Sequence, residues 1–357
     1  MRKLCLALLI SLINLSIAFS QGVNIPSSVW GLSFGNSTSF NGIRFNIVDK
    51  DIEKINGINI SAWGIKESSR QTGTVNGISI GLPAAWGTEY RNGINIGLIG
   101  VGAKKDIKGI NLGLLGTGAG RNAIGVNFGA LGAGAGENLV GLNIGGLGVG
   151  AGENMAGINL GGLGAGAGGD VRGITAGLLG AGAGEDMIGV NFGGLGVGAG
   201  ETLGGINVGG LGVGAGENLW GLNVGGLGVG AGESVTGINL SLLAVGAGEH
   251  LKGISIAGLG TGAPKITGLQ VSLVSGGEQV TGITIAPAYF RIEDEDGSYM
   301  KGLSVSAFNH IMGDQFGVAI GIFNYAWSVR GFQLGILNHV KSNPKGLRWL
   351  PIFNTSF

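Results

Sequence analysis

Carboxylate side chains recur once every 16 residues through the middle of the chain, a spacing that could assemble a row of cation ligands. The members of this Glu row are Glu137, Glu153, Glu185, Glu201, Glu217, Glu233 and Glu249, with Gly169 in place of one of them. If the copies stack as neighbouring strands, adjacent carboxylates lie about 5 Å apart, where like charges repel unless water or cations screen them. We therefore expect a solvated corner, and the alternative is a row of weak divalent-cation sites.

Amide side chains recur with the same spacing. This Asn row comprises Asn95, Asn111, Asn127, Asn143, Asn159, Asn191, Asn207, Asn223 and Asn239, interrupted by Thr175. Amide side chains that stack in register hydrogen-bond to one another as a ladder. We expect a structural ladder, and the alternative is a row that binds a ligand.

The acidic run and the histidines fit the pattern of a metal site less well. The acidic run comprises Glu293, Asp294, Glu295 and Asp296. It lacks the alternating carboxylate spacing of an EF-hand loop, so we expect a solvated loop. His250, His310 and His339 are far apart in sequence, with no Cys or second His beside them. We expect surface or turn histidines rather than zinc ligands.

Gly-rich tracts such as GGLGVGAGE match known site motifs only superficially. A G-x-G-x-x-G nucleotide fingerprint needs a helix after it, and Gly at this density disfavours helix. A calcium-binding nonapeptide needs Asp at its sixth place, which is Gly150 in the tract from Gly145. We predict no catalytic, cofactor-binding or metal residues and no enzyme activity, and we identify no small-molecule substrate.

The element that positions these rows is a 16-residue repeat, present in eleven consecutive copies over residues 77–252. A clear copy is GLNIGGLGVGAGENMA, residues 141–156, and we number positions 1–16 from its opening Gly. Looser copies begin at Gly42 and Gly57, and irregular copies fill residues 253–357. By this count we expect the last four copies to carry Asn309, Asn324, Asn338 and Asn354 at the place where the central copies have Gly. We predict one continuous repeat domain over 42–357, preceded by a cap over 21–41.

Within a copy the apolar residues alternate with period two, which predicts strands. Leu142 and Ile144 should point to one side and Asn143 to the other, and we expect Leu, Ile, Val and Ala to fill the interior in columns. Residues 145–146 and 152–154 read as two corners. Ala at position 11, Ala151 in this copy, should lie where two walls come close.

Two all-β folds fit this pattern. The first is a β-solenoid of about 16-residue coils, each copy forming one turn. The alternative is an outer-membrane β-barrel with one strand per copy, a fold that could serve as a channel. Near-identical successive copies and scarce aromatic residues in the central block favour the solenoid, because up and down strands of a barrel meet different surroundings.

The ends and the composition suggest export. Residues 1–20 have Arg2 and Lys3 before an apolar stretch, and Ala18-Phe19-Ser20 fits a signal cleavage site. Cleavage removes both cations and the single cysteine, leaving 19 basic and 21 acidic residues and a formal net charge of −2. The sequence contains no basic patch of the kind that indicates binding to nucleic acid. With 80 glycines among 357 residues, mean hydropathy is still +0.40, unlike a polar linker.

The Gly-apolar-Asn-apolar-Gly-x-Leu units, such as GINLGLLG over residues 109–116, resemble the leptospiral-type surface repeat-containing protein family. Residues 42–63 and the closing segment 331–357 are also similar to it. The resemblance implies a secreted, cell-surface or outer-membrane protein and supplies no catalytic residues. We expect an exported, non-enzymatic surface protein with a structural or adhesive role, whose partners are the outer membrane or surface macromolecules.

Overall fold

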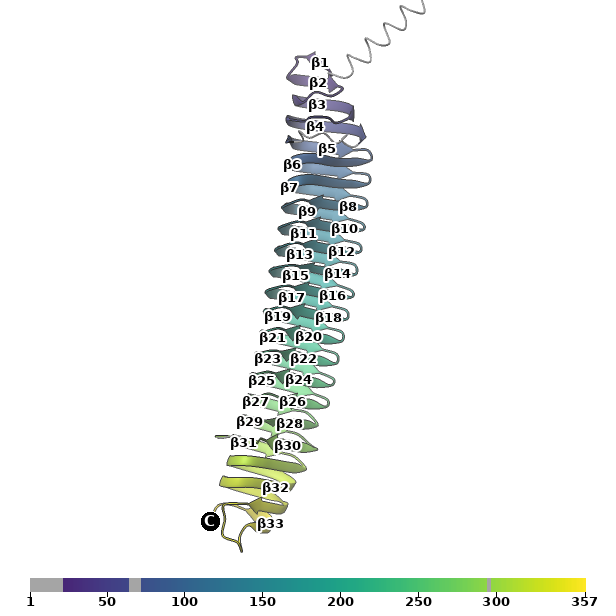
Figure 1. Cartoon of the computed structure of the whole chain (residues 1–357). Coiled ribbons are helices and arrows are strands. Elements are labelled where there is room, and N and C mark those ends of the chain that lie inside the picture. Colours follow the sequence, from purple (N-terminus) through teal and green to yellow (C-terminus); the bar gives the residue numbers. More distant parts are fainter. Residues whose placement is uncertain (1–21, 64–71, 294–296) are drawn as a thin grey trace, which may run out of the picture. The chain divides into compact units, whose positions relative to one another are not determined.

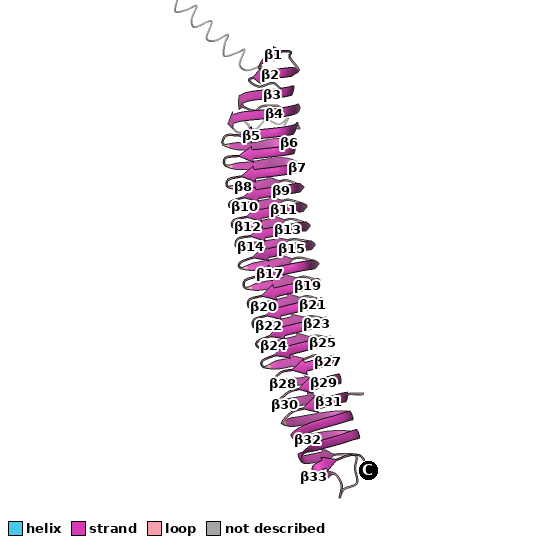
Figure 2. Cartoon of the chain, turned by 180° about the vertical axis from the view of Figure 1, so that it is seen from behind, coloured by secondary structure: helices cyan, strands magenta, loops and turns pink. Residues whose placement is uncertain are grey.

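The protein is a β-solenoid. The computed structural model describes residues 22–63, 72–293 and 297–357, and these form strands joined by short bends, without a helix (Figure 2). Among these residues there is accordingly no helix long and apolar enough to cross a membrane. The chain divides into two compact units, residues 1–177 and 178–357, each with its own stack of coils.

The first unit contains the strands that precede residue 178. They are β1 (Val23–Pro26), β2 (Trp30–Phe34), β3 (Ser39–Val48), β4 (Lys54–Trp63), β5 (Thr74–Gly81), β6 (Ala84–Gly97), β7 (Gly100–Gly113), β8 (Gly116–Ala119), β9 (Ala123–Gly129), β10 (Gly132–Ala135), β11 (Leu139–Gly145), β12 (Gly148–Ala151), β13 (Met155–Gly161), β14 (Gly164–Ala167) and β15 (Val171–Gly177).

The second unit contains the remaining strands. They are β16 (Gly180–Ala183), β17 (Met187–Gly193), β18 (Gly196–Ala199), β19 (Thr202–Gly209), β20 (Gly212–Ala215), β21 (Asn218–Gly225), β22 (Gly228–Ala231), β23 (Ser234–Ser241), β24 (Ala244–Ala247), β25 (His250–Ala257), β26 (Gly260–Gly262), β27 (Lys265–Val271), β28 (Val274–Gly277), β29 (Gln279–Ile285), β30 (Tyr289–Ile292), β31 (Tyr299–Val305), β32 (Phe308–Val340) and β33 (Trp349–Asn354).

Along the regular copies, parallel pairing between every second strand builds two walls in each unit (Figure 1). Longer strands such as β11 and β13 form the long-strand wall, and shorter strands such as β12 and β14 form the short-strand wall. Equivalent residues of successive copies lie side by side, for example Asn143 beside Asn159. The barrel alternative is therefore wrong, because a barrel of this kind pairs consecutive strands antiparallel.

Antiparallel strands occur at the outer end of each stack. β1 pairs antiparallel with β2, which then pairs parallel with β3. β33 folds back antiparallel onto the last part of β32. Such a reversal occupies the hydrogen-bonding edge that a coil would otherwise leave for another chain.

The interior holds the Asn row, which reverses the expected facing. Asn143 is fully buried, whereas Ile158 and Leu160 of the next coil are 42% and 38% exposed. The prediction that Leu142 and Ile144 fill the interior is wrong, and both are only partly buried. A period of two defines two faces but not which one is inside. Here stacking gives the amides of this row partners in the neighbouring coils, and within the described residues of the row only the Oδ1 atoms of Asn95 and Asn191, at the start of the ladder in each unit, lack one.

Apolar columns at positions 9 and 15 flank the Asn row and complete the core. Val149 and Met155 represent them and are 4% and 1% exposed. Position 7 lies in the first bend, and its Leu147 is 51% exposed. Ala151 at position 11 is half-buried, so the expectation that it separates two closely packed walls is wrong. The second corner occurs where expected, at residues 152–153, and the first lies at residues 146–147, one residue later than predicted.

Glycines at several positions are dictated by the stacking. At position 1, Gly141 has φ +120°, and a Cβ there would lie 2.0 Å from the Gly125 carbonyl oxygen. The corner glycine Gly152 would meet the Gly136 carbonyl at 1.9 Å. A side chain at these places collides with the backbone of the preceding coil. Gly therefore recurs at these positions because coils that stack directly over one another leave no room for a Cβ.

Some of the irregular C-terminal copies, such as those from Gly268 and Gly302, are one residue shorter before their second strand than the regular copies. Pairing places Asn309 beside Phe290, which in turn lies beside Ser275. These residues belong to the buried column that contains Val245 and Thr261. The expectation that Asn309 and its equivalents replace an outward Gly is therefore wrong. Asn309, Asn324 and Asn338 form a second internal ladder, in which each Nδ2 donates to the next Oδ1 at 2.7 Å. Asn354 is also buried, but its Nδ2 donates to backbone carbonyls such as that of Arg348.

Candidate interaction surfaces

The Asn row forms a continuous hydrogen-bonded ladder in each unit. In the first unit each Asn Nδ2 donates to the Oδ1 of the next, at 2.8 Å from Asn95 through Asn159. In the second unit the ladder begins at Asn191 and continues to Asn239 at 2.8 to 2.9 Å. The predicted ladder is confirmed. Because its amides are buried and paired, the alternative of a ligand-binding row is wrong.

The Glu row occupies an outer corner. Glu153, Glu217 and Glu249 are exposed there, and their backbone N–H groups donate to the equivalent residue one coil earlier. Within the described ranges, no group of three or more His, Cys, Asp or Glu side chains is arranged to hold a metal ion. The geometry thus favours the solvated corner over the cation-site alternative.

Apolar side chains cover the outside of the long-strand wall. In the second unit we call this surface the apolar wall. Its position 2 row comprises Val190, Ile206, Leu222, Ile238, Ile254, Leu269, Ile283 and Leu303, and its position 4 row comprises Phe192, Val208, Val224, Leu240, Ile256, Val271, Ile285 and Val305. Ile206, Ile238 and Ile283 are 44–45% exposed. These rows are the side chains expected in the interior.

The outside of the short-strand wall carries almost no side chains along the regular copies. Position 8 and position 10 are Gly in most of them, and a Cβ at Gly212 or Gly214 would be 3.7 or 3.6 Å from its nearest neighbour. This is ordinary contact, and Ala244 occupies position 8 in one coil. The coils around Gly212 and Gly214 therefore have room for Ala, whereas a Cβ at Gly100 or Gly134 would lie 3.0 or 3.2 Å from the carbonyl oxygen of the next coil.

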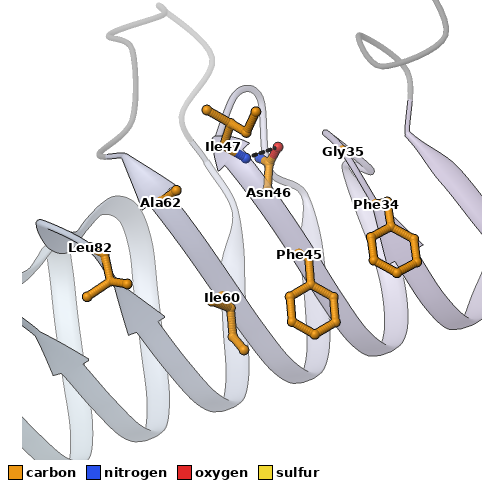
Figure 3. Close-up of a pocket in the computed structure, with 8 residues that line it drawn as sticks. All are labelled: Phe34, Gly35, Phe45, Asn46, Ile47, Ile60, Ala62 and Leu82. Carbon is orange, nitrogen blue, oxygen red and sulfur yellow. Dashed lines mark hydrogen bonds between the residues drawn. The ribbon is translucent and has the colours of Figure 1, made fainter. Parts of the chain in front are cut away.

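An apolar hollow of about 370 Å³ lies on the first coils (Figure 3). Its lining comprises Phe34, Gly35, Phe45, Asn46, Ile47, Ile60, Ala62 and Leu82. The rings of Phe34 and Phe45 stack with centroids 5.5 Å apart. Asn46 is the polar member, and its Nδ2 donates to the Val48 carbonyl at 2.7 Å. The hollow has room for an apolar group but presents no titratable side chain to it.

Charged side chains are enclosed beneath the same coils. Arg44 Nη1 lies 2.5 Å from Asp49 Oδ1, and both side chains are buried. Burial raises the pKa of Asp49, but the Arg44 charge and hydrogen bonds from Ser61 and Asn46 outweigh it, so the pKa is lowered. Burial lowers the pKa of Arg91 to about 10. This network is enclosed, so its role is to hold the first coils together.

An aromatic column runs along the last coils, in β30, β32 and β33. It comprises Tyr289, His310, Tyr325, His339 and Trp349. Successive ring centroids are 6.3, 5.3, 5.0 and 4.2 Å apart. The Tyr289 hydroxyl and His310 Nδ1 are within hydrogen-bond distance at 2.9 Å. Trp349 is 51% exposed, so the column ends at an accessible ring.

The two histidines in the column favour the neutral form. Burial, and then the charge of Arg291, lower the pKa of His310. Burial also lowers the pKa of His339, and the nearby charges of Arg348 and Lys341 add to the effect. His250 is exposed as expected. The expectation of a surface or turn position is wrong for His339, which is 9% exposed and packed against rings.

Sequence reasoning missed the aromatic column, although a signal was present. His310, Tyr325 and His339 each follow the opening Gly of their copy by eight residues. Equal spacing in a solenoid predicts stacking, as it did for Asn.

Of the acidic run, Glu293 is exposed, and Asp294, Glu295 and Asp296 lie outside the described residues. The expected signal segment, residues 1–20, also lies outside them.

Comparison of the chain with protein-family models, with curated proteins and with solved structures finds no match. The assignment of function therefore depends on the geometry of the surfaces and on the pattern of the sequence.

Proposed function

We propose that this chain is an exported, non-enzymatic repeat protein of the bacterial cell surface, with a structural or adhesive role. The observation that carries the proposal is the repetition of the same exposed side chains coil after coil, as in the rows of Ile and Leu on the long-strand wall. A repeated surface offers many equivalent weak contacts, and these add up to strong attachment through avidity. A single catalytic pocket has no need of such repetition.

Two features of the sequence support export to the surface. Residues 1–20 have the charge and apolar pattern of a secretory signal, and the opening and closing segments resemble a family of surface repeat proteins. The outer membrane and surface macromolecules are the proposed partners. The proposal includes no cofactor and no small-molecule substrate.

Surface location is tested with a cysteine variant, because Cys5 is the single cysteine and lies in the proposed signal. Intact bacteria that express the full chain as Glu217→Cys are treated with a membrane-impermeant maleimide. We expect labelling at this exposed corner, and a mature N-terminus at Gln21. Val229→Cys, at a 3% exposed position, is the control that should react only after unfolding. Labelling of Glu217→Cys only after cell lysis would contradict the proposal.

The structural or adhesive role needs its own test. A strain without the chain should attach less to solid surfaces or lose envelope integrity, and expression of the intact chain should restore the lost property. Unchanged attachment and an unchanged envelope in that strain would count against both roles.

A further inference from the structure

The apolar wall of the second unit is as large as the largest apolar patches that monomeric proteins leave exposed. Eight neighbouring strands, from β17 to β31 in the long-strand wall, have seven or eight residues each. Standard strand dimensions give a sheet face about 23 Å wide and about 38 Å long, or about 900 Å². Two of its three outward rows are apolar, whereas the position 16 row contains Thr and Lys, so the apolar part is about 600 Å². The largest patch on an ordinary monomer is about 300–600 Å². An area of this size indicates a surface that is covered by a partner.

We propose that a second copy of this chain covers the apolar wall, so that two solenoids pack long-strand wall against long-strand wall. A standard protein interface buries about 800 Å² on each partner, and the whole sheet face of the wall offers about that area. This goes beyond the proposed function, since it assigns a specific partner to one face.

The spacing of the rows is the first argument for a second copy. Side chains of one row are one coil apart, about 4.8 Å, along the whole unit. Another copy has ridges and grooves with the same spacing, so all coils can interdigitate together, as facing sheets do in a β-sandwich or a steric zipper. A partner with a different spacing matches only a few coils.

Trp220 provides an anchor within the wall. A Cβ built on Gly204 would lie 2.2 Å from the Trp220 ring, so the indole lies over the bare backbone of the neighbouring strand. The side chain is nevertheless 43% exposed. Trp is the residue type most enriched among side chains that dominate binding energy, and here it interrupts an otherwise uniform surface.

Charge disfavours a lipid surface as the occupant. The charged outward residues of these eight strands, at positions 16, 2 and 4, are Lys252 and Lys301. The adjacent corner carries the Glu row, whose members in this unit are Glu185, Glu201, Glu217, Glu233 and Glu249. Acidic groups outnumber the lysines beside the wall, so anionic lipid headgroups would be repelled.

The same charges select the orientation of the two copies. The Glu row runs along one edge of the wall only. Parallel copies related by a two-fold axis along the solenoid keep their Glu rows on opposite edges, whereas antiparallel copies bring the two rows together. Like charges facing each other are unfavourable, so the copies are parallel and equivalent coils face each other.

Cysteine cross-linking tests both the surface and the orientation. The purified full chain is prepared as Val190→Cys, Ile238→Cys or Ile283→Cys, all in the middle row of the wall, and treated with a short bis-maleimide. In a parallel dimer the same residue of the two copies lies face to face, so each of the three variants should form a cross-linked dimer. If only Ile238→Cys cross-links, the copies are antiparallel and the orientation is wrong. Gly214→Cys, on the short-strand wall, is the control, and its cross-linking in place of the others would overturn the choice of face.

Light scattering after size exclusion tests association itself. The unaltered chain should have the mass of a dimer at micromolar concentration. The double variant Ile206→Lys, Ile254→Lys should have the mass of a monomer. Leu211→Lys with Leu259→Lys changes equally exposed residues at the first bend and should leave the dimer intact. A monomeric mass for the unaltered chain up to sub-millimolar concentration overturns the proposal. So does flotation of the chain with phosphatidylglycerol vesicles that is lost in the Ile206→Lys, Ile254→Lys variant, because the occupant is then lipid.

Discussion

At the scale of single residues, two kinds of Gly share one repeat and have opposite significance. A Cβ on Gly221, at position 1, would lie 2.0 Å from the Gly205 carbonyl oxygen at φ +107°. A Cβ on Gly214, at position 10, would be 3.6 Å from its nearest neighbour, and its φ is not in the left-handed region. The first Gly is needed because coils stack directly, while the second lowers stability without being required.

This difference predicts opposite effects of the same substitution. Gly221→Ala should destabilise the protein by roughly 2–4 kcal/mol, because strain at a positive φ adds to a collision with backbone. Gly214→Ala should be neutral or stabilise it by about 0.5–1 kcal/mol, because Ala restricts the unfolded chain. Urea denaturation followed by circular dichroism measures both. Equal effects of the two substitutions would mean that the coils do not stack in this register.

A buried Asn in the ladder has two partners, one in each neighbouring coil. Asn207 accepts from Asn191 and donates to Asn223, at 2.8 and 2.9 Å. Asn207→Leu leaves a buried donor on Asn191 and a buried acceptor on Asn223, so we expect a loss of about 2–4 kcal/mol. Asn207→Thr should cost less, since Thr175 occupies the row elsewhere and its Oγ1 lies 3.5 Å from Asn159 Nδ2. If Leu is tolerated as well as Thr in denaturation experiments, the ladder does not contribute to stability.

At the scale of elements, β30, β32 and β33 are joined by the aromatic column as well as by backbone pairing. The column places His310 between Tyr289 and Tyr325, and His339 between Tyr325 and Trp349. Stacking and edge contacts of this kind each add about 0.5–1.5 kcal/mol beyond simple burial. The final coils therefore have stacked rings in addition to an amide ladder of their own, formed by Asn309, Asn324 and Asn338.

The lowered pKa values of His310 and His339 predict acid sensitivity of these coils. A histidine whose folded pKa lies below its unfolded value of 6.5 takes up protons more readily when unfolded. Its stabilising contribution is complete above pH 6.5 and declines as the pH falls from there through the folded pKa. The melting temperature of the last coils should thus decrease between about pH 7 and about pH 5.

Fluorescence of Trp349 reports this transition, because its ring lies 4.2 Å from that of His339. The matched control is His310→Phe with His339→Phe, which keeps two rings in the column and removes both titrating groups. Its melting temperature should be independent of pH in this range. If the control loses stability with acid as much as the unaltered chain does, then another group is responsible.

At the scale of the whole molecule, each unit behaves as a stack of equivalent coils, in which a coil contacts mainly its neighbours. Stability in such a stack is approximately a sum over coils and over contacts between adjacent coils. The outer ends differ, because β1–β2 and β33 pair antiparallel and occupy edges that could otherwise recruit another chain.

This additivity predicts that a whole coil can be removed. Deletion of residues 205–220 joins two copies in the same register, so that Asn191 and Asn223 become ladder neighbours. We expect a folded, cooperative protein with a small decrease in melting temperature. Deletion of residues 205–212 removes half a coil and should prevent normal folding, since inward and outward positions no longer match. Scanning calorimetry gives the melting temperature of both variants. An equal decrease for the two deletions would rule out independent coils.

The sequence alone determined the repeat length, favoured the solenoid over the barrel, placed the corners to within a residue and predicted the amide ladder, because stacked identical copies must align identical residues. It did not determine which face of Leu142-Asn143-Ile144 is inside, since alternation has the same period for either choice. Counting along the sequence also misaligned Asn309, because a copy shortened by one residue at a bend shifts every later position in that copy. Only the tertiary structure decided these points, through the hydrogen bonds that bury Asn and leave the apolar rows on the surface.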